Sequence, residues 1–226
     1  LGRRKNKMNF IGLIPPFLIC TIPVLAALAC MVVLIKEFKL SFGFIAVFCG
    51  LFAVVPIVAI QFFLEVFRLV NAHSLFSVLI KSILVNGVVE ETIKMAVFFL
   101  FPSKKMSMKV FFACAVLSGL SLGCFETLIY IASGIKNLEL RLLTAVVIHS
   151  CCAGLSGLFV FNLKNRSFKI YPFVLAVLLH GIYNYFAGFK MDSMFFWFSL
   201  VVVLIAVVEC RIRYRAMNPE GLILFQ

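Results

Sequence analysis

Acidic residues and histidines recur inside long apolar stretches of this sequence. Glu90 and Glu91 are adjacent, Glu126 stands in the next apolar stretch, and His149 and His180 stand in the two after it. Ionisable groups are costly inside a bilayer, so several at a similar depth are typical of a functional site. Because carboxylates and imidazoles bind metal ions and activate water, we expect a buried catalytic site.

Two chemistries fit these residue types. In the first, His149, His180 and a carboxylate, assigned here to Glu126, hold a zinc ion with an open water position while another glutamate acts as general base. In the second, no metal is bound: a glutamate takes the proton of water, and a histidine or Asn184 stabilises the oxyanion. Asn184 lies four residues after His180, on the same helix face. The sequence leaves both chemistries open.

The spacing around the glutamate pair predicts separate roles for its two members. Glu90 and Lys94 are four residues apart and can form an ion pair on one helix face, with Lys94 in a supporting role. Glu91 points about 100° away and requires another partner. A run of small residues at 118–123 precedes Glu126 and predicts a close contact with a neighbouring helix beside this carboxylate.

Composition defines the elements that must position these groups. The 226 residues are 64% hydrophobic and 13% charged, with a mean hydropathy of +1.14, which is too apolar for a water-compatible surface. Apolar stretches of about 20 residues predict an all-α, polytopic transmembrane helical bundle and exclude an outer-membrane barrel. We expect a single integral-membrane domain over residues 1–226, with a catalytic core at about 76–188. The predicted spans are residues 10–35, 41–64, 76–102, 108–133, 141–162, 168–188 and 193–209.

The net charge of +12 is explained by membrane topology rather than by nucleic-acid binding, because the positive residues form short clusters between apolar stretches. Loops on one side carry Lys104, Lys105, Lys109, Lys164, Arg166, Lys169, Arg211, Arg213 and Arg215. Loops on the other side carry Arg68, Lys136, Arg141 and Lys190. The first side is therefore predicted to be cytoplasmic, which places the amino terminus outside and the polar layer in the outer half of the membrane.

The basic start LGRRKNK conflicts with an external amino terminus. We interpret residues 1–7 as an extension that precedes a natural start at Met8. Two alternatives are that Pro15 and Pro16 break the first span, or that residues 66–80 add a membrane pass.

Four motifs on successive spans resemble the PrsW family of intramembrane proteases. They are EETIK at 90–94, GCFETLIY at 123–130, His149 with its glycine-rich continuation, and HGIYN at 180–184. The family is distantly similar to the CAAX prenyl endopeptidase and bacteriocin-processing superfamily, and the resemblance covers about residues 86–188. It implies cleavage of a membrane-bound protein, typically an anti-sigma factor at its extracytoplasmic side, with Glu90 as the base. The EExxK pattern differs from the EExxxR of the CAAX enzymes and argues against prenyl-protein processing.

We therefore predict an intramembrane endopeptidase of the bacterial cytoplasmic membrane. Its expected partners are the lipid bilayer and a single-span membrane protein substrate. One alternative is a proton-coupled transporter or channel component, since buried carboxylates and histidines also form proton relays, and another is a non-catalytic membrane scaffold that has kept the fold. The sequence leaves the metal and the oligomeric state open. The predicted catalytic residues are Glu90, Glu91, Glu126, His149, His180 and Asn184.

Overall fold

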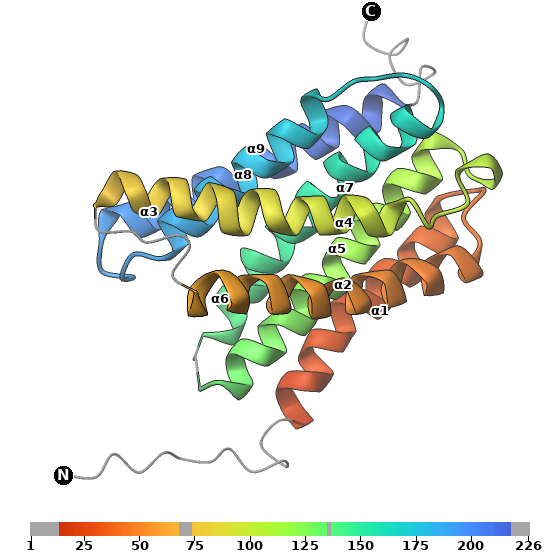
Figure 1. The fold of residues 1–226 in the computed structure, drawn as a ribbon. Helices are drawn as coiled ribbons and strands as arrows, with labels where there is room; N and C mark the ends of the chain where they lie inside the picture. Colours follow the sequence, from red (N-terminus) through yellow and green to blue (C-terminus); the bar gives the residue numbers. More distant parts are fainter. Residues whose placement is uncertain (1–13, 68–73, 135–136, 218–226) are drawn as a thin grey trace, which may run out of the picture.

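The computed structural model describes residues 14–67, 74–134 and 137–217, and every regular element in these ranges is a helix (Figure 1). The predicted all-α bundle is confirmed. Residues 1–7 and Met8, on which the alternative start depends, lie outside the described residues, as do Arg68 and Lys136. The helices are α1 (Ile14–Leu34), α2 (Leu40–Val66), α3 (Leu75–Lys81), η2 (Ser82–Val89), α4 (Glu90–Phe98), η3 (Ser103–Lys105), α5 (Met108–Ala132), α6 (Leu138–Leu143), α7 (Ala145–Lys164), α8 (Tyr171–Ala187) and α9 (Met194–Ala216).

Each predicted span corresponds to one helix or to helices in succession. The third span is divided among α3, η2 and α4, and the sixth is the 17-residue α8. Pro15 and Pro16 lie in the first turn of α1, where proline is tolerated, and do not break the helix. Among the residues that the structure describes, five stretches are long and apolar enough to cross a bilayer, so the chain is an integral membrane protein: Ile14–Leu34, Leu40–Val66, Met108–Ala132, Leu138–Lys164 and Met194–Ala216.

Helix α7 forms the centre of the bundle and packs against α4, α5, α8 and α9. The predicted small-residue contact beside Glu126 is the α5–α7 interface. A Cβ atom at Gly119 would overlap the carbonyl oxygen of His149, and one at Gly123 would lie 3.2 Å from the His149 Cβ. Glycine at these two positions allows the helices to approach closely and brings the His149 backbone against α5.

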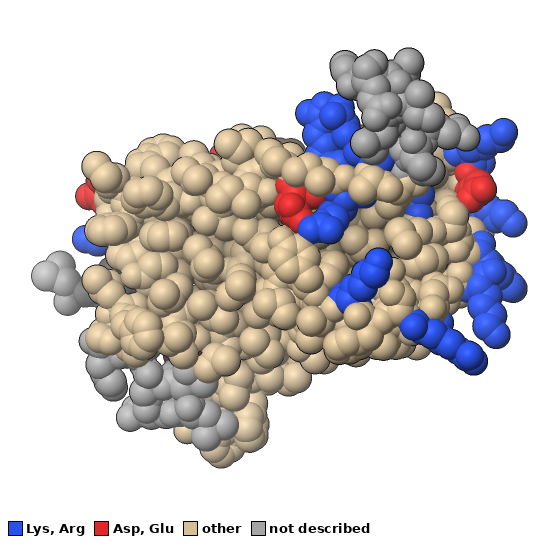
Figure 2. Space-filling view, turned by 90° about the horizontal axis from the view of Figure 1, so that it is seen from above, with Lys and Arg blue, Asp and Glu red and all other residues tan. Residues whose placement is uncertain are grey.

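Lysine and arginine side chains gather at one end of the molecule (Figure 2). The α1–α2 and α4–α5 connections lie at this end, whereas α3 lies at the opposite end (Figure 1). Lys164 Nζ donates hydrogen bonds to the carbonyl oxygens of Phe99 and Phe101, at 2.9 and 2.6 Å, and so fastens the end of α7 to the segment after α4. The uneven distribution of positive charge that the loop sequences predict is therefore also present in the folded bundle.

Candidate active site

A π-helix, η2, leads directly into the glutamate pair at the start of α4. Helix α8 approaches η2 closely, because a Cβ atom at Gly87 would lie 2.5 Å from the Val177 carbonyl oxygen and one at Gly181 would lie 2.6 Å from the Ile83 Cα. Short π-helical segments are frequent at functional sites. This backbone contact brings α8, with His180, next to the glutamate pair.

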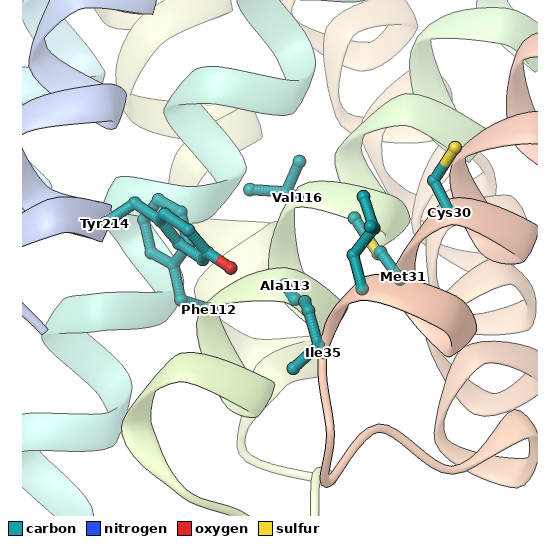
Figure 3. A pocket seen from close by; sticks show the side chains of 8 residues that line it. Cys30, Met31, Ile35, Phe112, Ala113, Val116 and Tyr214 are labelled. Atoms are coloured by element: carbon teal, nitrogen blue, oxygen red, sulfur yellow. The ribbon is translucent and has the colours of Figure 1, made fainter. Parts of the chain in front are cut away.

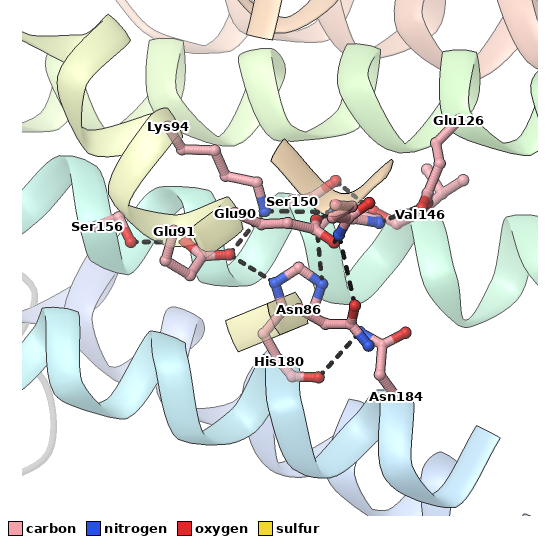
Figure 4. Close-up of polar contacts among 12 residues, drawn as sticks. Asn86, Glu90, Glu91, Lys94, Glu126, Val146, Ser150, Ser156, His180 and Asn184 are labelled. Atoms are coloured by element: carbon pink, nitrogen blue, oxygen red, sulfur yellow. Dashed lines mark hydrogen bonds and ion pairs between the residues drawn. The ribbon is translucent and has the colours of Figure 1, made fainter. Parts of the chain in front are cut away.

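Glu91 is fully buried and is bound on both oxygens (Figure 4). Its Oε1 accepts a hydrogen bond from Lys94 Nζ at 2.6 Å and lies 2.8 Å from His180 Nδ1, and its Oε2 accepts from the Ser156 hydroxyl at 2.7 Å. The predicted ion pair between Glu90 and Lys94 is wrong: Lys94 pairs with Glu91. A three-residue spacing also places two side chains on one helix face, and Glu91 is the carboxylate enclosed between α7 and α8.

His149 is held by a second carboxylate. Its Nε2 lies 2.8 Å from Glu126 Oε2, and Arg141 Nη2 lies 3.3 Å from the same oxygen. The Arg141 guanidinium also stacks 3.9 Å from the centre of the Tyr130 ring. Arg141, predicted only as a loop charge, therefore extends from α6 into the network. His149 Nδ1 faces inward and is hydrogen-bonded to Lys94 Nζ at 3.3 Å.

Glu90 faces both histidines. Its Oε1 accepts a hydrogen bond from Gln61 Nε2 at 2.8 Å, while its Oε2 lies 3.7 Å from His149 Nδ1 and 3.6 Å from His180 Nε2. Glu90 Oε2 and His180 Nε2 are buried and have no hydrogen-bond partner. One ligand atom from each of Glu90, His149 and His180 lies within 4.8 Å of the other two.

This group has the donor set and the unpaired atoms expected of a metal site. Buried polar atoms without partners are rare and costly, so the unpaired Glu90 Oε2 and His180 Nε2 indicate a missing ligand. Metal-binding histidines usually use their second ring nitrogen to bind a carboxylate, as His180 does with Glu91 and His149 does with Glu126. Two imidazoles and a carboxylate therefore fit a divalent ion.

The predicted site residues thus fall into two groups. Six of them form one connected network, in which Glu90 stands beside both histidines and Glu126 stands behind His149: Glu90, Glu91, Lys94, Glu126, His149 and His180. Asn184 lies at its edge, where its side-chain amide donates to the His180 carbonyl oxygen at 3.1 Å. Residue spacing does not reveal which of three glutamates faces the histidines.

Besides Arg141, the structure adds Gln61 and Ser156, which contact predicted residues, and Asn86, which contacts Gln61; none of them was singled out as a site residue in the sequence. Gln61 is an amide inside an otherwise apolar span, which is a signal that could have identified it. Asn86 accepts a hydrogen bond from Gln61 at 3.4 Å and lies one helical turn before Glu90. Ser156 lies in the glycine-rich continuation after His149, and its hydroxyl binds Glu91.

An apolar hollow of about 240 Å³ lies between α1, α5 and α9 (Figure 3). Its lining contains none of the predicted site residues. The hollow is lined by Cys30, Met31, Leu34, Ile35, Phe112, Ala113, Val116 and Tyr214.

The family model described as PrsW family intramembrane metalloprotease matches residues 39–209. No curated protein and no solved structure matches the chain. The matched region runs from the start of α2 into α9 and includes all the residues of the polar network. It covers most of the chain and agrees with the buried histidine and glutamate cluster. The chain belongs to the PrsW family of intramembrane metalloproteases.

Proposed function

We propose that His149 and His180 hold the catalytic metal ion of this protease beside Glu90, and that the ion is zinc. The observation that carries the proposal is the pair of unpartnered atoms, Glu90 Oε2 and His180 Nε2, which face each other and His149 Nδ1 inside the bundle. When bound, a zinc ion acidifies water and polarises the scissile carbonyl group.

The outer carboxylates fix the orientation of the two histidines. If His180 donates Nδ1–H to Glu91, the lone pair of its Nε2 faces Glu90; if His149 donates Nε2–H to Glu126, the lone pair of its Nδ1 faces the same point. Lys94 and Arg141 neutralise these two carboxylates. Glu91, Lys94 and Glu126 are therefore positioning residues in this mechanism.

Glu90 is the general base. Glu91 is bound on both oxygens and Glu126 is bound by His149 and Arg141, whereas Glu90 retains an unpartnered oxygen. Glu90 Oε2 takes the proton of the attacking water and returns it to the departing amine. Asn184 turns its side-chain amide from the His180 carbonyl to the developing oxyanion.

We further propose that the substrate is a single-span membrane protein, of the anti-sigma-factor type, cleaved in the outer half of the bacterial cytoplasmic membrane. The gathering of basic side chains at the end of the bundle away from α3 supports this orientation. The catalytic core, at about residues 76–188, carries all these catalytic and positioning groups.

Purified protein in lipid nanodiscs, incubated with a panel of tagged single-span membrane proteins, tests the proposal. We expect cleavage by the wild type, zinc bound near one equivalent, and loss of both in His149→Ala and His180→Ala. Glu90→Gln keeps an oxygen that can contact the ion but no proton acceptor, so zinc is retained and cleavage is lost. The control is Glu139→Gln, which changes an exposed glutamate on α6 and leaves both readouts unchanged.

Absence of cleavage by the wild type across the panel would overturn this proposal. Equal zinc content in wild type and both histidine variants would remove the metal assignment, even if cleavage were lost.

A further inference from the structure

A cavity of about 630 Å³ opens beside Glu90, at the end of the molecule that holds α3. It lies between the end of α2, the α3–η2 segment and the end of α8. Its wall includes three amide side chains and, at its rim, an ion pair; these residues are Gln61, Asn86, Asn184, Glu65 and Lys81. We call this cavity the amide cleft.

The amide cleft is connected directly to the catalytic carboxylate. Gln61 Nε2 donates to Glu90 Oε1 at 2.8 Å and also contacts Asn86 Oδ1 at 3.4 Å, so α2 and η2 share a hydrogen-bonded wall. Asn184 stands beside Asn86 on the α8 side (Figure 4). A molecule in the cleft therefore lies against amide groups, one of which, Gln61, is hydrogen-bonded to Glu90.

Amide groups both donate and accept hydrogen bonds, as a peptide backbone does. A transmembrane helix satisfies its backbone groups internally, so it must unwind to expose a scissile bond and then needs new partners in a low-dielectric site. Gln61, Asn86 and Asn184 offer such partners where the rest of the lipid-embedded surface is largely apolar. The chemistry of the cleft matches an unwound peptide segment.

The rim of the cleft is closed by a weak contact. Lys81 Nζ lies 3.0 Å from Glu65 Oε2 and joins α3 to α2, and both side chains are partly exposed. Exposed ion pairs contribute little to stability, so α2 and α3 can separate there at low cost. This gives a lateral path from the lipid to the amide cleft.

We propose that the amide cleft binds the unwound, extended segment of the membrane protein substrate around its scissile bond. The segment enters between α2 and α3, and the side chains of Gln61, Asn86 and Asn184 hydrogen-bond its backbone. This inference rests on the proposed function and adds the place and the chemistry of substrate binding.

Site-specific photocrosslinking tests the location. A benzophenone amino acid replaces Val78 on the wall of the cleft, in the full-length Glu90→Gln protein, which does not consume the substrate. The control places it at Val116, in the apolar hollow of Figure 3. We expect a crosslink to a tagged single-span substrate from Val78 and a background signal from Val116. A crosslink from Val116 with none from Val78 would overturn the inference.

The kinetics of Asn86→Ala test whether the amide side chains of the cleft hydrogen-bond the substrate backbone. Loss of one backbone hydrogen bond should raise the KM for the membrane substrate about 5- to 10-fold, with zinc content and kcat near wild type. An unchanged KM would count against the amide cleft. Wild-type cleavage is scored in the same nanodiscs: its absence overturns the proposed function, whereas wild-type cleavage without the Val78 crosslink overturns only this inference.

Discussion

Replacing Lys94 with methionine removes the cation that neutralises Glu91 while keeping an unbranched side chain of similar length. The Glu91 side chain is 0% exposed and that of Lys94 is 2%, so water does not replace the missing charge. Breaking a buried ion pair from one side typically costs about 3–5 kcal/mol. Protonating a carboxyl group of ordinary pKa at pH 7 costs about 3.7 kcal/mol, at about 1.4 kcal/mol per pH unit. Both estimates predict that Lys94→Met lowers the free energy of unfolding by about 4 kcal/mol.

A double variant separates this charge effect from packing. Glu91→Gln with Lys94→Met removes both charges of this buried pair, and the amide can still bind His180 and Ser156, so about 2–3 kcal/mol of stability should return. Zinc affinity should remain about 10- to 100-fold below wild type, because a neutral amide orients His180 less strongly than a carboxylate. Stability and metal binding are thus expected to respond differently.

Denaturant unfolding in bicelles and competitive zinc titration measure the two effects. Lys81→Met is the control, since it removes a cation that is one-third exposed and should cost less than about 1 kcal/mol. The reasoning would be refuted if Lys94→Met cost no more than this control, or if the double variant were destabilised by the sum of its two single changes.

Three other changes have defined outcomes. In Gly123→Ala the new Cβ would lie 3.0 Å from the Val146 Cα and 3.2 Å from the His149 Cβ and Cδ2, so a displaced imidazole should lower zinc occupancy, whereas Gly188→Ala, with its nearest neighbours at 3.4 Å, should not; equal occupancy by mass spectrometry would contradict this. Arg141→Gln removes the cation bound to Glu126 and should weaken zinc binding about tenfold in the same titration, and unchanged affinity would exclude a positioning role. Chelation should abolish cleavage and lower the unfolding midpoint, with zinc restoring both, since a ligand at 100 times its Kd stabilises by about 2.7 kcal/mol; a midpoint insensitive to chelator would oppose a bound ion.

The spans were predictable because a bilayer requires helical segments of sufficient length and low polarity. The division of the third span was not, because the π-helical turn of η2 coincides with a contact to Gly181 on α8, which hydropathy does not encode. That Glu90, His149 and His180 would gather in one cluster was also predictable, since they are costly groups in apolar surroundings.

The pairing within the site was beyond sequence analysis. Lys94 is three residues from Glu91 and four from Glu90, and both spacings permit an ion pair. Which glutamate pairs with Lys94 depends on α7 and α8, because these helices bring Ser156 and His180 to Glu91 and complete its set of hydrogen-bond partners. Arg141 was assigned to a loop for a similar reason: its contact with Glu126 depends on how α6 turns back onto α5.

The formal charges of the described network are consistent with a bound cation. Counting both histidines as neutral, the network holds three carboxylates and two cations, an excess of one negative charge; these are Glu90, Glu91, Glu126, Lys94 and Arg141. An uncompensated charge is costly within a bilayer, and a divalent ion with a deprotonated water would balance it. Each cation also contacts an outer glutamate, Lys94 on Glu91 and Arg141 on Glu126, which leaves Glu90 as the carboxylate whose charge faces the two histidines.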